Sequence, residues 1–250
     1  MRVGFIGTGE IASYMVRALA GQEHQITVSA RNGDKAKALA AAHAEVQVAQ
    51  NRQVIAQSDT VFLCLMADTA RAVLPGLDFR ADQTVISVMA DLPLAELRAL
   101  CAPATQIACT IPLSAIATGG SMLPVYPASP ALEALFGRAN QVVTVASETA
   151  LNAHFAGSAL SAPLIALMQT GARWLAAETG DSHAAERYVA GVFEGFLRQM
   201  QETGADFDTL LQGLATEGGL NASLRAHMED HGAPAALTAG LDALKPRLGL

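Results

Sequence analysis

The sequence predicts an α/β protein in which a doubly wound parallel sheet is followed by an all-helical region. Short apolar runs alternate with Ala-rich amphipathic stretches in the first part of the chain. Most of these runs are continuously apolar, as expected of strands buried on both faces of a parallel sheet. Beyond residue 149 the remaining patterns all have a helical period. We therefore expect two domains, residues 1–148 and residues 149–250.

Strands and helices alternate along the first domain, which predicts a sheet with helices on both of its faces. The expected strands are Val3–Ile6, Gln25–Ala30, Thr60–Leu65, Thr84–Val88, Gln106–Ile111 and Gln141–Val145. The expected helices between them are Ile11–Ala20, Asp34–Ala42, Asn51–Gln57, Thr69–Leu74, Pro93–Cys101 and Pro130–Gly137.

The second domain carries helical patterns with Gly and Asp at their joints. The segments are Ala150–Ala177, Ser182–Thr203, Asp206–Leu214, Leu220–His231 and Pro234–Leu248. The segment that begins at Ser182 has a wide apolar stripe at helical period. Either the domain's own core or a second copy of the chain covers such a stripe.

Composition limits the classes of function. Half of the residues are hydrophobic (51%), and the formal net charge is −7, from 16 basic and 23 acidic residues. Acidic and basic residues are mixed along the chain, so we expect neither nucleic acid nor an anionic membrane as a partner. We also expect no membrane span, because no uncharged stretch approaches the required length of about 20 residues.

The cysteines and histidines predict neither disulfides nor a metal site. Cys64, Cys101 and Cys109 have no CxxC spacing, and the six histidines follow no metal-ligand pattern. Three unpaired thiols suit a reducing compartment. The chain opens directly on its first expected strand, without a signal peptide. The expected location is the cytoplasm.

The segment from Val3 to Ala12 has the form strand–GxGxxA–helix. The first glycine of this fingerprint allows a sharp turn, the second lets the backbone approach a pyrophosphate, and the alanine keeps the helix close to the sheet. The helix N-terminus offers free N–H groups to phosphates. This context indicates a Rossmann dinucleotide site. Its expected contacts are Gly7, Thr8, Gly9, Glu10, Ile11 and Ala12.

The end of the second strand favours NADP over NAD. An NAD site usually has an Asp or Glu there, for the ribose hydroxyls, but no carboxylate follows before Asp34. Ser29 is expected to donate a hydrogen bond to a 2′-phosphate, and Arg31 to pair with that phosphate and stack on the adenine. Lys35 adds a further positive charge. The alternative is that Arg31 is a solvated loop residue.

At this point the sequence resembles the pyrroline-5-carboxylate reductases, which reduce a cyclic imine to proline. The similar stretches are Gly4–Gly9 with Ala12, Ile86–Leu94 ("ISxxAGxPL" in the family), Ala156–Ala159 ("SGSG") and Glu217–Asn221 ("PGG-x-T"). The resemblance implies a helical domain that interleaves with its twin in a homodimer. It also implies cofactor contacts at Met66 and Asp68.

Compared with the family that the sequence resembles, the residues expected to line the substrate pocket differ in this chain. Asn221 stands at the position of the family's Thr, which hydrogen-bonds the ring nitrogen, and Leu113 at that of an Asn near the nicotinamide. Glu217 replaces the Pro of the glycine-rich loop. Asn221 and Ser158 are the expected catalytic residues. Gly218, Gly219 and Leu220 are the expected substrate contacts, the two glycines through N–H groups that suit a carboxylate. Asn221 and Ser158 can instead be ordinary residues at helix starts.

The sequence leaves three functions open. The first is an NADPH-dependent imine reductase, whose iminium carbon needs orientation more than a catalytic constellation. The second is an NADP-dependent dehydrogenase of a hydroxy acid or another carbonyl compound, which normally needs a Lys or His as an acid. His154, near the domain junction, is the one plausible acid, although a satisfied interfacial histidine is the plainer interpretation. The third is a sensor that binds the cofactor without catalysis.

Overall fold

The computed structural model describes residues 1–250 and divides into two compact units. The first unit comprises residues 1–155 and 246–250, and the second residues 156–245. The chain passes between the units within α7 (Glu148–Ser158) and within α12 (Ala233–Leu248). The boundary therefore lies a few residues beyond the change of sequence pattern, and the last turn of the chain belongs with the first unit.

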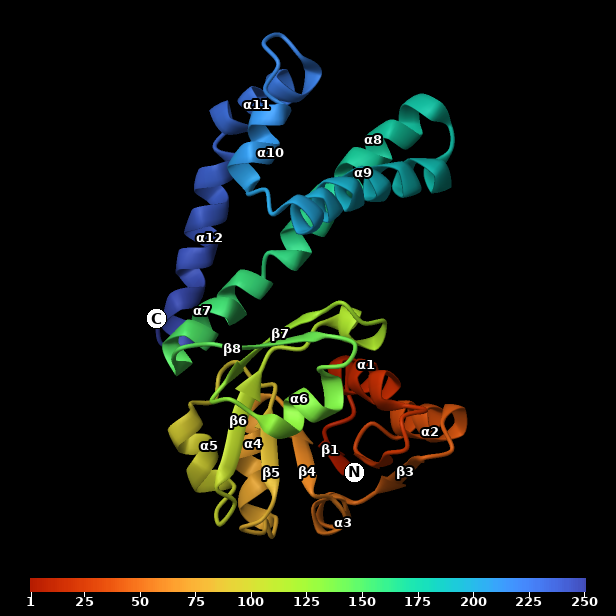
Figure 1. Cartoon of the computed structure of the whole chain (residues 1–250), viewed down its shortest axis with the longest axis vertical. Coiled ribbons are helices and arrows are strands. Elements are labelled where there is room, and N and C mark those ends of the chain that lie inside the picture. The colour runs from red at the N-terminus through yellow and green to blue at the C-terminus, as the bar shows by residue number, and fades with distance from the viewer. The chain divides into compact units, whose positions relative to one another are not determined.

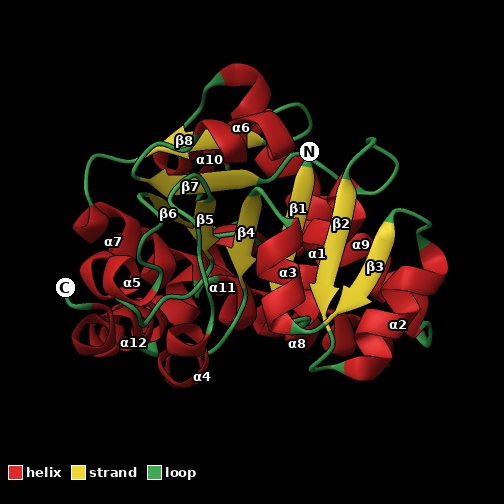
Figure 2. Cartoon of the chain, turned by 90° about the horizontal axis from the view of Figure 1, so that it is seen from below, coloured by secondary structure: helices red, strands yellow, loops and turns green.

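The first unit holds an eight-stranded sheet in the order β3-β2-β1-β4-β5-β6-β7-β8 (Figure 2). The strands are β1 (Arg2–Ile6), β2 (Gln25–Ser29), β3 (Val46–Ala49), β4 (Thr60–Leu63), β5 (Thr84–Ser87), β6 (Gln106–Thr110), β7 (Met122–Tyr126) and β8 (Gln141–Thr144). All neighbours are parallel except β6 and β7. The order of the first six strands, 3-2-1-4-5-6, is that of the Rossmann fold. The predicted fold class is confirmed.

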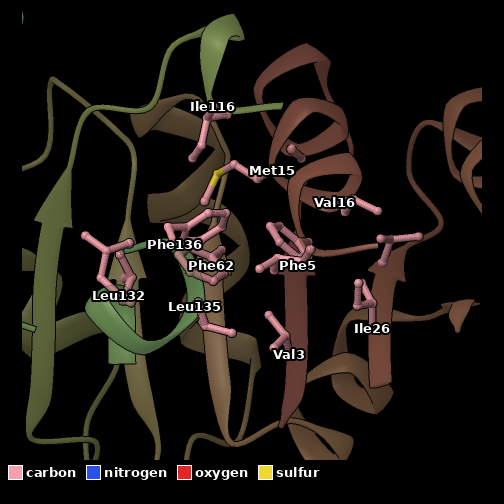
Figure 3. Close-up of a cluster of buried hydrophobic side chains, with 14 of the residues drawn as sticks. Val3, Phe5, Met15, Val16, Ile26, Phe62, Ile116, Leu132, Leu135 and Phe136 are labelled. Carbon is pink, nitrogen blue, oxygen red and sulfur yellow. The ribbon is translucent and has the colours of Figure 1, made fainter. Parts of the chain in front are cut away.

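Helices cover both faces of this sheet. They are α1 (Glu10–Leu19), α2 (Gly33–Ala42), α3 (Asn51–Gln57), α4 (Ala67–Val73), α5 (Leu94–Leu100) and α6 (Pro130–Phe136), with 3₁₀ turns η1 (Leu74–Gly76) and η2 (Ser114–Ala117). On one face α1, α2 and α6 enclose a core in which Phe5 stacks on Phe62 and Phe136 meets Phe62 edge-on (Figure 3). On the other face α3, α4 and α5 bury a second cluster against the same strands.

Two strands were missed by the sequence pattern. β3 is a short edge strand in which Gln47 and Val48 are both exposed, so it lacks the continuous apolar run of the buried strands. β7 contains Pro124, which has no N–H for a sheet ladder and argues against a strand. The Pro124 carbonyl still accepts a hydrogen bond from Thr110 Oγ1 at 2.8 Å.

The second unit is all-helical, as expected. Its helices are α8 (Ser161–Thr179), α9 (Ser182–Thr203), α10 (Phe207–Gly213), α11 (Leu220–Asp230) and most of α12, with α8 and α9 packed side by side (Figure 1). The expected segment Ala150–Ala177 is two helices, because the chain turns at Ala159–Leu160 between α7 and α8.

The expectation that no segment is long and apolar enough to span a membrane was wrong. Residues 149–172 contain no Asp, Glu, Lys or Arg, and Glu148–Thr179 meets the length and composition of a span, with a mean hydropathy of 1.3. The turn between α7 and α8 interrupts this segment. Apolar helices that pack on other protein have the same composition, so length and composition are weak grounds for a membrane.

Candidate functional site

The glycine-rich turn lies where β1 ends, beside the end of β4. These neighbouring strands continue to helices on opposite faces of the sheet, α1 and α4, so the turn occupies the topological switch point where ligands bind in open α/β sheets. Gly7 has a φ of +94°, and a Cβ added to it would lie 2.2 Å from the Cys64 carbonyl oxygen. The turn therefore requires glycine at this position.

Gly9 differs from Gly7 because a Cβ added there would meet no atom within 4 Å. It is the N-cap of α1, and no side chain caps the helix. The N–H groups of the first helical turn consequently have no intrahelical acceptor. Ala12 is fully buried and holds α1 against the sheet, as the fingerprint predicts. The open space beside Gly9, next to free helix donors, fits the pyrophosphate of a dinucleotide.

Ser29 supports this turn. Its Oγ accepts a hydrogen bond from the Gly7 N–H at 2.8 Å, and its carbonyl accepts one from Thr8 Oγ1 at 2.6 Å. Ser29 is fully buried and Thr8 nearly so. The prediction that Ser29 donates to a 2′-phosphate does not fit this geometry, because the hydroxyl points into the glycine turn. Sequence pattern alone gives no sign of which way this side chain turns.

Arg31 stands free just beyond β2. It is exposed and has no ion-pair partner in the chain, whereas Lys35 forms an ion pair with Glu10. The Glu10 pKa is lowered by its hydrogen bond to Lys35. Arg31 is therefore available to pair with a phosphate, whereas the positive charge of Lys35 is already balanced by Glu10. The neighbouring Asn32, which the sequence analysis did not single out, is exposed and accepts from Lys35 N at 3.5 Å as the N-cap of α2.

Two further expected cofactor residues follow β4. Met66 is the N-cap residue of α4, and its side chain is 69% exposed at the carboxyl edge of the sheet. The Asp68 carboxylate is exposed and lies 3.1 Å from Arg71 Nη1. Met66 ends the turn that follows β4, the strand next to β1, and Asp68 lies in the first turn of α4, both close in sequence to Cys64, the neighbour of Gly7.

The expected substrate residues lie in the second unit. Ser158 is the last residue of α7, partly buried, and its carbonyl accepts from Ser161 Oγ at 2.8 Å. Leu220 and Asn221 are the first two residues of α11, and Leu220 is 90% exposed. Asn221 makes no capping bond, since the N-cap is Gly219 without a side-chain cap. Its amide therefore remains free.

The glycine loop differs in one respect from the expectation. The Gly219 N–H donates to the Thr216 carbonyl at 2.9 Å, so it is not a free donor for a substrate carboxylate. A tight turn in which Gly218 has a φ of +70° creates this bond. The free donors of the loop are the Gly218 N–H and those of the first turn of α11, at Leu220 and Asn221.

His154 has a hydrogen-bond partner on its own helix, as expected of an ordinary helix residue. Its Nδ1 lies 2.7 Å from the Ala150 carbonyl oxygen one turn earlier on α7, which makes Nδ1 the protonated nitrogen. The exposed Nε2 is then an acceptor in the neutral ring.

The first part of the chain is similar to a known family. Residues 2–91 match the family model described as "NADP oxidoreductase coenzyme F420-dependent". This range holds the fingerprint, the β2 end and the turn after β4, and the match confirms the predicted cofactor class, NAD(P). No curated protein matches the sequence.

Comparison with solved structures extends to the whole chain. A 1-pyrroline-5-carboxylate reductase from Streptococcus pyogenes superposes with a TM-score of 0.84 at 19% identity, covering 100% of this chain and 99% of that one. The chain has the fold of the pyrroline-5-carboxylate reductases. The resemblance noted from the sequence is thereby confirmed for the fold of both units.

Two other structures show how far this fold extends. A pyrroline carboxylate reductase from Plasmodium falciparum with NADP bound gives a TM-score of 0.84 at 12% identity, covering 100% of this chain and 97% of that chain. A reductive aminase from Aspergillus terreus in complex with NADPH gives 0.60 at 17% identity, with coverage of 98% and 87%.

Proposed function

We propose that this protein is an NADPH-dependent reductase of a small cyclic imine that works as a homodimer. The observation that carries the cofactor assignment is the open backbone at Gly9 beside the uncapped N-terminus of α1. Both lie at the switch point of a sheet whose strand order is that of dinucleotide-binding proteins.

The preference for NADPH rests on Arg31. A 2′-phosphate beside Arg31 meets a guanidinium without an internal partner, at the start of the ten-residue helix α2. No carboxylate occupies the β2 end to bind the ribose hydroxyls of NAD. Asn32 adds an exposed amide at the same helix N-terminus.

An imine is the substrate class that these residues suit best. When bound, NADPH supplies the hydride that reduces the C=N bond. An iminium carbon is already electrophilic, so the protein's task is to orient it and exclude water. A carbonyl substrate needs an acid to protonate the alkoxide. His154 Nδ1 is bonded to Ala150, and Lys245 is paired with Asp242. Lys245 is therefore not free to act as that acid, and His154 has only its exposed Nε2 for proton transfer.

The loop before α11 is our proposed substrate segment. The N–H groups of Leu220 and Asn221 suit an anionic or polar substrate group, and the Asn221 amide is free to hydrogen-bond an amine nitrogen. An amide is no general acid, so Asn221 can orient the nitrogen but not protonate it. Glu217, exposed in the same loop, favours a cationic substrate nitrogen. Ser158 is the remaining residue that we propose for the substrate site.

A homodimer is proposed because the second unit lacks a core of its own. Of residues 156–245, only three are buried, and all three are alanines: Ala156, Ala172 and Ala185. Its large exposed apolar side chains include Leu164, Ile165, Leu167, Trp174, Tyr188, Val192, Phe193, Leu197, Phe207, Leu211, Leu224 and Met228. Exposure on this scale is unusual for a monomer in water. A second copy that covers these helices also accounts for the apolar segment 149–172 without a membrane.

The cytoplasm is the proposed location of the protein. Its three thiols are not in disulfides, which suits a reducing compartment.

The proposal is tested with a substrate panel. NADPH oxidation is followed at 340 nm with cyclic imines, including pyrroline-5-carboxylate, and in parallel with the ketones and 2-oxo acids of the same size. Turnover confined to imines supports the proposal. Turnover of carbonyl compounds instead would identify a dehydrogenase, and NADPH binding without turnover of any compound would identify a sensor.

A further inference from the structure

The loop between β5 and α5, residues 88–93, is held by side chains from three different helices. It leaves the carboxyl end of β5, the edge of the sheet at which ligands bind in this architecture. Arg247 on α12 and Arg71 on α4 contact the loop itself, and Glu148 on α7 binds Leu94, the residue directly after it. Two of these helices, α7 and α12, are also the segments through which the chain passes into the second unit.

Asp91 and Arg247 form the main contact. Arg247 Nε lies 2.9 Å from both carboxylate oxygens of Asp91, and Nη2 lies 2.6 Å from Oδ2. The two residues are 156 positions apart in the sequence. Arg–carboxylate pairs with two donor nitrogens fix orientation as well as position, which a single contact cannot do. The Asp91 side chain is 26% exposed and that of Arg247 is 62% exposed, so the pair lies at the surface and its two-nitrogen geometry matters more than its charge.

The residue after Arg247 strengthens the attachment. Leu248 is 7% exposed, and its carbonyl oxygen accepts a hydrogen bond from Asn152 Nδ2 at 2.9 Å. Asn152 lies on α7, so this bond joins α7 to the last turn of α12. The two crossings of the chain into the second unit are thereby fixed to one another within the first unit.

The loop is held from its other end as well. Glu148, the first residue of α7, accepts a hydrogen bond from Leu94 N at 2.7 Å and so caps the N-terminus of α5. Arg71 Nη2 reaches the Asp91 carbonyl at 3.4 Å, while its Nε binds Glu96 at 2.8 Å. Loop 88–93 therefore cannot move without disturbing both α7 and α12.

We propose that Asp91 and Arg247 form a latch through which the two connections to the helical unit position loop 88–93. This rests on the proposed function in one respect, namely that the loop then borders the nicotinamide end of the cofactor. Arg247 is a positioning residue in this scheme, since it acts on the site through the loop.

The latch is tested by hydrogen–deuterium exchange on the full-length protein without cofactor. Arg247→Met keeps the alkyl stem but removes the charge. We expect exchange to accelerate about tenfold in residues 88–94 and 244–250 and to stay unchanged in the β2–β3 region. Asp91→Arg combined with Arg247→Asp restores slow exchange if the pair itself is responsible. Arg225→Met is the matched control, because it removes an exposed arginine whose ion-pair partner, Glu229, is on the same helix.

Three results would overturn the latch: unchanged exchange in residues 88–94, acceleration spread evenly over the sheet, or an equal effect of Arg225→Met. Failure of the charge exchange to restore protection counts against it as well. NADPH added to the wild type reports separately on the cofactor site through slower exchange in residues 7–13. If that protection is missing, the proposed function fails while the latch is judged on the cofactor-free comparison.

Discussion

Ser29 Oγ accepts the Gly7 N–H at 2.8 Å, so the end of β2 supports the turn at the end of β1. Both residues are buried, and the bond spans 22 positions of sequence. Ser29 and Arg31, two residues apart, accordingly have separable roles. Ser29 shapes the turn that receives the pyrophosphate, and Arg31 faces solvent where a 2′-phosphate would lie.

Ser29→Ala is expected to weaken NADPH and NADH by the same factor. The substitution leaves the buried Gly7 N–H without an acceptor, at a cost of about 1–3 kcal/mol in the free energy of unfolding. Cofactor titrations by fluorescence and a thermal melt measure both effects. Loss of NADPH affinity alone would mean that the hydroxyl contacts the 2′-phosphate after all.

Arg31→Ala is expected to weaken NADPH about ten- to a hundredfold while leaving NADH within about twofold. A charge-assisted contact to phosphate is worth about 1.5–3 kcal/mol, and each 1.4 kcal/mol is about a factor of ten. Lys35→Ala is the control, since that charge is already paired with Glu10. Equal losses for the two cofactors would contradict the role of Arg31.

Gly7→Ala and Gly9→Ala are expected to separate folding from binding. At Gly7 a methyl group meets the Cys64 carbonyl at a positive φ, so the free energy of unfolding falls by at least about 2 kcal/mol. At Gly9 the methyl group enters open space, so the melting temperature is preserved and cofactor affinity falls. A stable Gly7→Ala protein, or a Gly9→Ala protein that binds NADPH normally, would disagree with the structure.

Sedimentation velocity at micromolar concentration is expected to show a dimer. Phe193→Glu, placed on the exposed apolar face of α9, should shift the protein to monomers or to aggregates with lower melting temperature. Val48→Glu adds the same charge at an exposed apolar residue of the first unit and should leave the dimer intact. A monomeric wild type would refute the proposed assembly.

Cys101 and Cys109 are expected to resist alkylation in the native state. Burial raises the pKa of each thiol to about 12, so only about one molecule in ten thousand carries the thiolate at pH 8. In the unfolded chain the pKa returns to about 8.5. The stabilising contribution of the neutral thiols is therefore complete below pH 8.5 and declines as the pH rises toward 12. Rapid labelling of either cysteine in the native protein would contradict their burial.

The sequence predicted best where one local rule controls the structure. Continuous apolar runs located the interior strands β1, β2, β4, β5 and β6 and also the edge strand β8, and the fingerprint located the cofactor turn. Prediction from the sequence failed where a side chain contacts a residue far away along the chain. Nothing in the pattern indicates that Ser29 turns toward Gly7 or that Arg247 pairs with Asp91. β7 was missed because Pro124 has no N–H to donate to a sheet ladder, which argues against a strand at that position.

The most direct test of the central claim is the initial rate of NADPH oxidation with pyrroline-5-carboxylate, for the wild type and for Gly9→Ala. The two proteins should fold equally well, so a difference in rate reports the cofactor site. We predict turnover by the wild type, at least about tenfold faster than by the variant, with little activity on NADH. A wild type that binds NADPH yet reduces neither this compound nor any other cyclic imine would contradict the proposed function.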